Sequence, residues 1–221
     1  MNFHIISAVP QAFGNYFNTS ILGRAQNKGL ISVKVYDLRR WGIGKHKKID
    51  DRPFGGGPGM VLRVEPIYKA VNSIKSKIKK ERLAVRTILF SVRGKKFDSS
   101  QALRLSKYKN LILICGRYEG VDERVARYIA DEEISVGDFV LSGGEIPAMI
   151  VVDAVSRFIP GVLGKKESLE EFKGSYPTYT RPEVFSPKKG KKSFWRVPAV
   201  LLSGDHKKIS EWRKSFEKSS D

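Results

Sequence analysis

The chain has 221 residues, and its 41 Lys and Arg against 23 Asp and Glu give a formal net charge of +18 at pH 7. This length suits one large domain, or a medium domain followed by a small one. Hydrophobic residues make up 41% and charged residues 29%, which excludes general disorder. The apolar runs are far shorter than the ~18 residues of a membrane span, so no membrane segment is expected. The one cysteine, Cys115, excludes an internal disulfide and a cysteine-based metal site.

The start of the chain and the total charge give two further expectations. Residues 1–9 have no basic stretch and no small-residue cleavage site, so we expect no signal peptide and a cytoplasmic protein. Three histidines, at positions 4, 46 and 206, are too scattered to predict a metal cluster. An excess of positive charge this large most often marks a polyanionic partner, and nucleic acid is the first candidate.

The charge is segregated along the chain. Residues 69–109 hold thirteen Lys and Arg and two acidic residues, a local net charge of +11, and residues 24–52 have a net charge of +6. Residues 113–145 reverse the sign, with eight acidic and three basic residues. One interpretation is a solvated basic surface. The other is a phosphate-binding surface beside a neutral-to-acidic pocket, whose small ligand would be cationic or zwitterionic because acidic groups repel phosphate.

The first 60 residues predict a buried strand, a helix, a half-exposed strand and a long loop. Thr19 or Ser20 can cap the start of the helix, and Gly29 is typical of its end. The second strand alternates apolar and polar residues with period two. The loop has no periodicity and ends in a glycine-rich segment, so we expect it to be functional. These elements are residues 3–8, 20–29, 31–36 and 39–60.

Residues 65–158 predict further alternation of helices and strands. A stripe of apolar residues at helical spacing marks the first of these helices, and continuous apolar runs mark the strands. Such alternation favours an α/β fold around a mostly parallel sheet. The predicted helices are 65–80, 99–106, 122–130 and 146–158, and the predicted strands are 86–91, 110–115 and 134–141.

The composition changes after residue 163. We predict an α/β domain over residues 1–163 and a polar interdomain linker over residues 164–178. A small, mainly helical domain is predicted over residues 179–221, with its clearest helix at 207–218.

Two glycine-bearing loops follow predicted strands, at Cys115–Gly120 and Ser135–Glu145. Ligands of α/β sheets bind where such loops gather at the carboxyl ends of strands, so the two loops predict a small-molecule pocket. Cys115 lies in an apolar context that favours a core residue over a nucleophile.

A third glycine-rich segment, Gly55–Gly59, fits either a phosphate cradle or a tight structural turn. It lacks the Lys-Ser/Thr of a Walker A loop, and no Gly-x-Gly-x-x-Gly joins a strand to a helix. The sequence therefore argues against NTP hydrolysis and against a Rossmann site.

Two charged pairs are ambiguous from the residues alone. Asp153 and Arg157 share a helix face. Either the two form a structural ion pair, or Arg157 is a functional arginine. Glu170 and Glu171 lie in the predicted linker and are either solvated or a base that a partner chain or substrate brings to a site.

Long segments of this sequence, in one order, carry a family resemblance. They are Asp50–Met60, Cys115–Arg124, Asp131–Glu145, Ser156–Gly164, Tyr179–Pro182, Val197–His206 and Trp212–Arg213. Together they resemble the bacterial tRNA (guanine-N1)-methyltransferases, the TrmD family of the SPOUT class, over nearly the whole chain.

The resemblance implies methylation of N1 of guanosine 37 in tRNA, with S-adenosylmethionine as methyl donor and Mg²⁺ as an aid to catalysis. It implies a SPOUT-type trefoil-knotted fold and a homodimer with a shared active site. Asp50, Arg52 and Arg181 are expected to bind tRNA. The implied cofactor pocket comprises Ser91, Gly94, Gly116, Tyr118, Glu119, Val136, Gly137, Phe139, Leu141, Gly143, Gly144 and Pro147.

The resemblance also implies a linker carboxylate as general base and a helix arginine that stabilises the O6 of the target guanine. The arginine position is Arg157, and the base position is Glu170, where the family has aspartate. Val92-Arg93 stands where the family commonly has Pro-Gln, and the C-terminal domain is expected to be a shortened tRNA-binding domain. Two alternatives are a catalytically silent SPOUT-fold RNA-binding protein and an rRNA methyltransferase of the same class.

Overall fold

The computed structural model describes residues 1–78, 84–163, 176–187 and 194–216. The chain divides into two compact units, Met1–Gly164 and Lys165–Asp221, which are described separately below. Within the described residues, no helix is long and apolar enough to cross a membrane.

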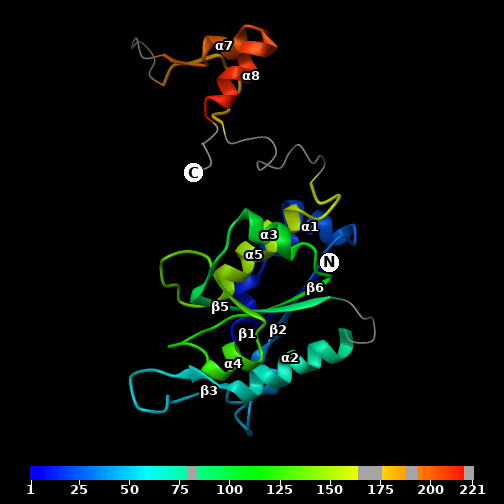
Figure 1. The fold of residues 1–221 in the computed structure, drawn as a ribbon, viewed down its shortest axis with the longest axis vertical. Coiled ribbons are helices and arrows are strands. Elements are labelled where there is room, and N and C mark those ends of the chain that lie inside the picture. The colour runs from blue at the N-terminus through cyan, green and yellow to red at the C-terminus, as the bar shows by residue number, and fades with distance from the viewer. Residues whose placement is uncertain (79–83, 164–175, 188–193, 217–221) are drawn as a thin grey trace. The chain divides into compact units, whose positions relative to one another are not determined.

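The first unit is built on a five-stranded sheet in which every neighbouring pair of strands is parallel, in the order β2-β1-β6-β5-β7 (Figure 1). The predicted α/β architecture with a mostly parallel sheet is therefore confirmed. The central strand β6 is apolar after its first residue, Asn110, and completely buried, as parallel strands covered on both faces are. The strands are β1 (Asn2–Ser7), β2 (Ser32–Asp37), β5 (Val85–Lys96), β6 (Asn110–Ile114) and β7 (Glu132–Ser135).

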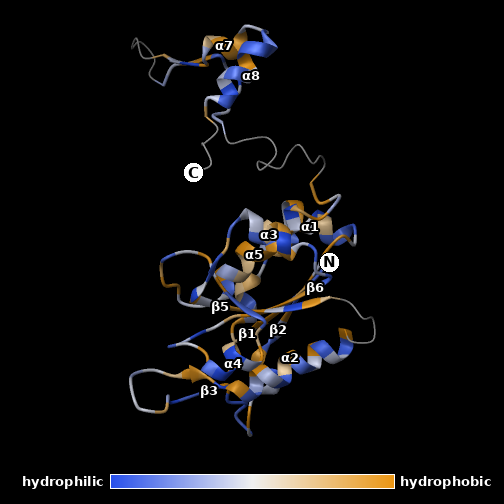
Figure 2. Ribbon diagram, in the orientation of Figure 1, coloured by the Kyte–Doolittle hydropathy of each residue, from blue (hydrophilic) through white to orange (hydrophobic). Residues whose placement is uncertain are grey.

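Helices cover both faces of this sheet, and Figure 2 shows its apolar strands lying between them. α1, α3 and α5 pack on one face, and α2 and α4 pack on the other (Figure 1). Each α-helix described in the first unit matches a predicted helix, with ends that differ by a few residues, although the predicted end of α2 lies outside the described residues. The helices are α1 (Ser20–Asn27), α2 (Val64–Ile78), α3 (Ser99–Leu105), α4 (Glu123–Tyr128) and α5 (Glu145–Arg157).

Two apolar cores result from this layering. On one face, Phe3 and Ile5 of β1 belong to the same buried cluster as Val151 and Val155 of α5. On the other face, Ile6 of β1 joins the predicted apolar stripe of α2, whose members are all buried. Successive residues of β1 therefore point to opposite cores, as the period of two in a strand requires.

The prediction of a strand over residues 134–141 is wrong beyond Ser135. β7 begins earlier, at Glu132, because Arg86 and Arg104 satisfy the Glu132 carboxylate at 2.7 and 2.6 Å. Residues 136–141 leave the sheet as a loop. β5 is longer than predicted, since after an irregularity between Phe90 and Lys95 it pairs with β7 a second time.

The capping prediction for α1 is only half right. Thr19 occupies the N-cap position, but its hydroxyl donates to the carbonyl of Tyr16 at 3.0 Å and makes no cap hydrogen bond. Ser20, the other candidate, begins the helix with a φ of 50°. The start of α1 thus keeps backbone N–H groups without a side-chain cap.

A short hairpin and three 3₁₀ helices are the remaining elements described in the first unit. In the first unit, β3 (Asp50–Asp51) and β4 (Val61–Leu62) pair antiparallel across the glycine-rich segment. Short 3₁₀ helices occupy η1 (Pro10–Phe13), η2 (Tyr16–Asn18) and η3 (Leu38–Trp41).

In its described residues, the second unit contains two paired strands and two helices. Asp205 caps α8 by accepting from the backbone of Lys207 and Lys208. Trp212 stacks edge-on with Phe216, and no described residue of this unit is buried. The helix predicted over 207–218 is confirmed as far as Lys214, and positions 217 and 218 lie outside the described residues. The elements are β8 (Val184–Phe185), β9 (Trp195–Arg196), α7 (Ala199–Leu202) and α8 (His206–Lys214).

Candidate functional site

A pocket of about 370 Å³ lies among the loops that follow β6 and β7 and the irregular part of β5. We call it the loop pocket. Both glycine-bearing loops singled out in the sequence contribute to it. It brings together eleven of the twelve residues expected to bind the cofactor: Ser91, Gly116, Tyr118, Glu119, Val136, Gly137, Phe139, Leu141, Gly143, Gly144 and Pro147.

Glycines let the two loops approach each other closely. The Gly144 N–H donates to the carbonyl of Gly116 at 2.9 Å, and Arg117 and Gly143 form an isolated antiparallel bridge. A Cβ on Gly144 would lie 2.6 Å from the Cα of Cys115, which is backbone and cannot rotate away. A side chain at this position would therefore push apart the two loops that form the pocket.

A buried carboxylate anchors the same loops from beneath. Glu145, only 3% exposed, accepts from the Ser7 hydroxyl at 2.7 Å and from Nε of Arg117 at 3.0 Å. Burial raises the pKa of the neighbouring Cys115 thiol well above its usual value. A buried neutral thiol is a poor nucleophile, which agrees with the prediction that Cys115 belongs to the core.

Three glutamates and two arginines, Arg93 and Arg117, line the loop pocket, so only a small acidic excess remains there. The Glu123 carboxylate accepts a hydrogen bond from the Arg93 guanidinium at 2.7 Å, so its charge is already paired. Oε2 of Glu133 is buried and has no hydrogen-bond partner among the described residues. A buried carboxylate oxygen without a partner is costly, and a bound ligand that carries N–H or O–H donors would satisfy it.

Gly94 is the expected cofactor residue that does not line the loop pocket. It lies where β5 returns to β7, and a Cβ there would be 2.5 Å from the backbone nitrogen of Ile134. The position needs glycine because two backbones meet, so its role in this structure is in strand packing.

The glycine-rich segment is attached directly to the loop pocket. The Glu119 N–H donates to the carbonyl of Met60, and the Leu62 N–H donates to the carbonyl of Gly120, both at 3.0 Å. Gly59 has a φ of +77°, and a Cβ there would collide with the Glu119 side chain. This segment is therefore held against the loop that follows β6, although its own residues do not line the pocket.

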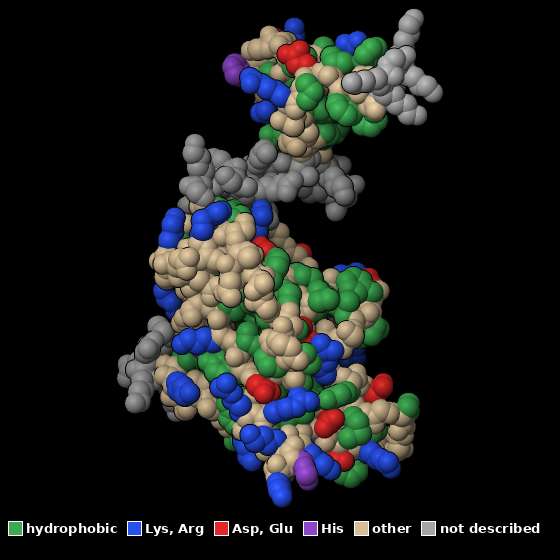
Figure 3. All heavy atoms as spheres, turned by 180° about the vertical axis from the view of Figure 1, so that it is seen from behind, with side chains coloured by type: hydrophobic (Ala, Val, Ile, Leu, Met, Phe, Trp, Pro, Cys, Tyr) green, Lys and Arg blue, Asp and Glu red, His purple; other side chains and the backbone are tan. Residues whose placement is uncertain are grey.

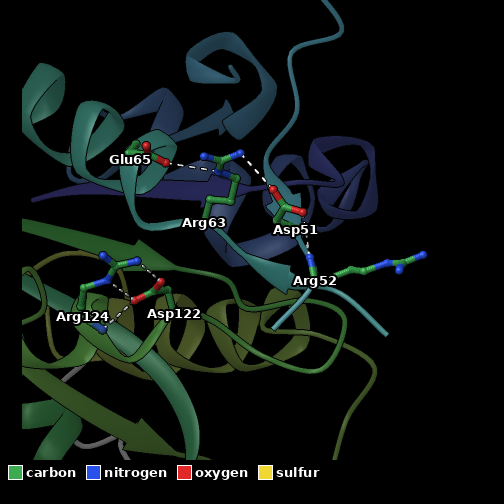
Figure 4. Close-up of polar contacts among 6 residues, drawn as sticks. All are labelled: Asp51, Arg52, Arg63, Glu65, Asp122 and Arg124. Carbon is green, nitrogen blue, oxygen red and sulfur yellow. Dashed lines mark hydrogen bonds and ion pairs between the residues drawn. The ribbon is translucent and has the colours of Figure 1, made fainter. Parts of the chain in front are cut away.

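Ion pairs beside the glycine-rich segment leave the guanidinium of Arg52 unpaired (Figure 4). Arg63 contacts both Asp51 and Glu65 at 3.2 Å, and Arg52 bonds to Asp51 only through its backbone N–H. Figure 4 shows the Arg52 guanidinium pointing away from this network. Within the described part of the chain it has no partner, so it can meet a phosphate without first breaking an ion pair.

Asp122 and Arg124 form a second contact in Figure 4, at the start of α4. Asp122 accepts from the backbone N–H and the guanidinium of Arg124, and these hydrogen bonds lower the pKa of the carboxyl. Asp50 lies in β3, where it pairs with Leu62 of β4. Arg181 belongs to the second unit and is exposed. Figure 3 shows Lys and Arg side chains spread over one face of the first unit, with fewer Asp and Glu among them.

A second cavity, of about 220 Å³, lies between η2, the start of α1 and the end of α5. We call it the Arg157 cavity. The ion pair between Asp153 and Arg157, one of the two sequence interpretations, is wrong: Asp153 accepts from the Tyr16 hydroxyl at 2.5 Å instead. Ser156 is fully buried, and its hydroxyl has no hydrogen-bond partner in the part of the chain that the structure describes. Arg157 makes no ion pair with any described residue. The residues that line the Arg157 cavity are Tyr16, Thr19, Ser20, Ile21, Leu22, Asp153, Ser156, Arg157 and Val162.

Two predicted site residues lie outside the described residues, and two residues of the cavities were not predicted. Glu170 and Glu171 lie outside the described residues, so their relation to either cavity stays a prediction. Sequence reasoning missed Tyr16, which no motif marks. It also missed the particular role of Glu133, for which the acidic stretch was only a general signal. Within the described residues, no group of three or more His, Cys, Asp or Glu is placed to hold a metal ion.

A family model described as "tRNA (Guanine-1)-methyltransferase TrmD" matches residues 1–220. A tRNA (guanine-N(1)-)-methyltransferase of Clostridioides difficile is 47% identical over 97% of this chain and 91% of its own length. One from Dictyoglomus turgidum is 51% identical over 95% of this chain and 82% of its own length. Among solved structures, the "tRNA (m1G37) methyltransferase from Aquifex aeolicus" superposes with a TM-score of 0.78 at 40% identity, covering 96% of this chain and 87% of that one.

Proposed function

The chain belongs to the TrmD family of tRNA (guanine-1)-methyltransferases, and from that membership we propose that it methylates N1 of guanosine 37 in tRNA with S-adenosylmethionine. The observation that carries the proposal is the loop pocket, in which eleven of the twelve expected cofactor residues meet around an acidic wall. A donor-bearing cationic ligand suits that wall.

The residues of the loop pocket fit S-adenosylmethionine on chemical grounds. When bound, this cofactor supplies an electrophilic methyl group on a sulfonium. The unpartnered Oε2 of Glu133 would accept a hydrogen bond from it, and the glycine loops would admit it close to their backbone. Glu119 would add negative charge at the rim.

The nucleophile must be prepared by the protein. N1 of guanine carries a proton at neutral pH, so a general base has to remove it before attack. We assign this role to Glu170, with Glu171 as the alternative. As the proton leaves, negative charge develops on O6, and we assign its stabilisation to Arg157, whose guanidinium has no ion-pair partner among the described residues.

The remaining parts of the proposal concern the partners. We propose a homodimer whose active site is shared, with the linker at residues 164–178 and a C-terminal tRNA-binding domain at residues 179–221. Asp50, Arg52 and Arg181 would contact tRNA, and the unpaired guanidinium of Arg52 supports its part. Location in the cytoplasm stays a prediction.

Mg²⁺ is proposed as an aid to catalysis and not as part of any step described here. The described residues provide no cluster of three ligands for it, so they do not define where it would bind. Its contribution is tested by removing it.

The deciding experiment incubates the intact protein with S-adenosylmethionine and a tRNA transcript bearing G37, and identifies the product by nucleoside mass spectrometry. We expect 1-methylguanosine at position 37, and none with a matched transcript bearing A37. Parallel reactions without Mg²⁺ test the ion. If the protein binds the tRNA and transfers no methyl group, it is a silent RNA-binding protein; methylation of rRNA alone would identify the other alternative.

The base assignment has its own test. Glu170→Ala should reduce single-turnover methyl transfer by about 10²-fold, since general-base catalysis contributes that much, while Glu171→Ala serves as the matched control. If the two effects are reversed, Glu171 is the base. If neither variant changes the rate, a linker glutamate is not the base.

A further inference from the structure

Asp153 and Arg157 do not pair, although their positions favour it. They lie four residues apart on α5, with the acidic residue nearer the N-terminus, which is the preferred order for a helical ion pair. Both line the Arg157 cavity. The Asp153 carboxylate is instead bound by another side chain.

The Tyr16 hydroxyl is the group that does so. It donates to Oδ2 of Asp153 at 2.5 Å, across 137 residues of sequence. The Tyr16 ring is held in turn by an edge contact with Phe17, at 5.8 Å between centroids, and Phe17 is buried in the core. The hydrogen bond raises the pKa of Tyr16 to about 12, so the hydroxyl keeps its proton throughout the physiological range.

We propose that Tyr16 is a positioning residue for Arg157, which it keeps free for the substrate by engaging Asp153. This inference rests on the proposed function, in which Arg157 stabilises the charge that develops on O6. A guanidinium already paired with a carboxylate would have to give up that pair to meet the new charge, and the stabilisation would be partly lost. The unpartnered Ser156 hydroxyl beside it marks the same cavity as built for a ligand.

The test replaces Tyr16 by phenylalanine in the intact protein. Tyr16→Phe keeps the ring contact and removes only the hydroxyl, so Asp153 becomes free to capture Arg157. We expect kcat to fall by about twofold to fivefold, the size of effect that an exposed ion pair has, with KM for S-adenosylmethionine unchanged. Tyr128→Phe, at a tyrosine 79% exposed on α4, is the matched control and should leave kcat unaltered.

Rescue separates positioning from a structural role. In Tyr16→Phe/Asp153→Asn the freed side chain is no longer a carboxylate, so Arg157 stays unpaired and kcat should return to that of the unsubstituted protein. If Tyr16 were only structural, the second substitution would add to the loss. Normal activity of Tyr16→Phe, or failure of the double variant to recover, overturns the inference.

A readout without turnover keeps this inference separate from the proposed function. In isotope-labelled intact protein, pairing with Asp153 should slow the exchange of the Arg157 Nε–H with water in Tyr16→Phe, and Asp153→Asn should restore it. Unchanged exchange overturns the inference even if the protein methylates tRNA. Conversely, the exchange result can support it even if no tRNA is methylated, in which case only the proposed function fails.

Discussion

Two cavities of the first unit are built in opposite ways. The loop pocket is made largely of backbone: Gly144 bonds to Gly116, and Gly143 bridges to Arg117. The Arg157 cavity is made of side chains, and Ser156 and Arg157 there lack partners among the described residues. Each cavity also holds a buried polar atom without a partner among the described residues, Oε2 of Glu133 in the loop pocket and the Ser156 hydroxyl in the Arg157 cavity, which a bound ligand could satisfy. The difference between them is therefore in what holds the walls, backbone contacts in the first and side chains in the second.

The largest expected effect tests the Arg157 cavity. Arg157→Lys keeps the positive charge but loses the planar fork, so it should lower kcat by about 10²-fold while leaving the affinity for S-adenosylmethionine unchanged. Single-turnover kinetics and calorimetry measure the two quantities. A loss of cofactor affinity equal to the loss of kcat would mean that the two cavities are one site.

A substitution in the loop pocket should instead change the affinity for S-adenosylmethionine. Gly144→Ala places a methyl group 2.6 Å from the Cα of Cys115, and overpacking of this kind should weaken cofactor binding by roughly 10–100-fold. Gly29→Asn is the matched control, because Gly29 has a φ of +69° that asparagine tolerates and nothing within 4 Å of its Cβ position. Calorimetry with S-adenosylmethionine gives the affinities, and circular dichroism checks the fold. Equal affinities in the two variants would contradict a pocket that depends on close backbone approach.

Charge in the loop pocket is a smaller term. Glu133→Gln removes the negative charge from the buried, unpartnered carboxylate and should weaken S-adenosylmethionine binding by about tenfold. Asp138→Asn is the control, since Asp138 lies in the same segment outside the pocket wall and pairs with Lys96 on the surface. If both variants bind the cofactor like the unsubstituted protein, the acidic wall does not select the ligand by charge.

Binding of tRNA and of cofactor should differ in their response to salt. Phosphate contacts release counterions, so tRNA affinity should fall steeply with ionic strength while cofactor affinity barely changes. Arg52→Gln should reduce the slope of log affinity against log salt by about one. Arg63→Gln should reduce it less, because Arg63 is already neutralised by Asp51 and Glu65. Equal slopes for tRNA and cofactor would remove the distinction between the two surfaces.

Sequence patterns carried the fold well because burial leaves a periodic record. The apolar stripe of α2 and the continuous apolar run of β6 predicted a helix and a strand that the structure confirms. The strand expected over 134–141 failed beyond Ser135, because the apolar residues there line the loop pocket and not the sheet. An apolar residue in a pocket wall and one in a strand look alike in sequence.

The functional sites were likewise predictable where the signal is local in sequence and were missed where a long-range contact decides. Glycines at strand ends leave a local signal that predicted a pocket, and eleven of the cofactor residues that the family resemblance implied meet there. Gly94 carries the same local signal, yet its neighbour is the backbone of Ile134, a contact that only the fold creates. The bond between Tyr16 and Asp153 joins residues 137 positions apart and breaks an ion pair that helical spacing favoured. No local pattern records such a contact.

The smallest effect concerns the pH response of Tyr16. The hydrogen bond to Asp153 raises its pKa to about 12, above the value of 10.0 for a free tyrosine. A folded-state pKa above the unfolded value stabilises the fold fully below pH 10, and this stabilisation is lost as pH rises from 10 to 12. The difference in unfolding free energy between the unsubstituted protein and Tyr16→Phe should therefore shrink over that window. Subtracting the tyrosinate absorbance titration of Tyr16→Phe from that of the unsubstituted protein isolates this one residue. A midpoint near 10 would mean that the hydroxyl is not bound to Asp153, and with it the reason for an unpaired Arg157 would disappear.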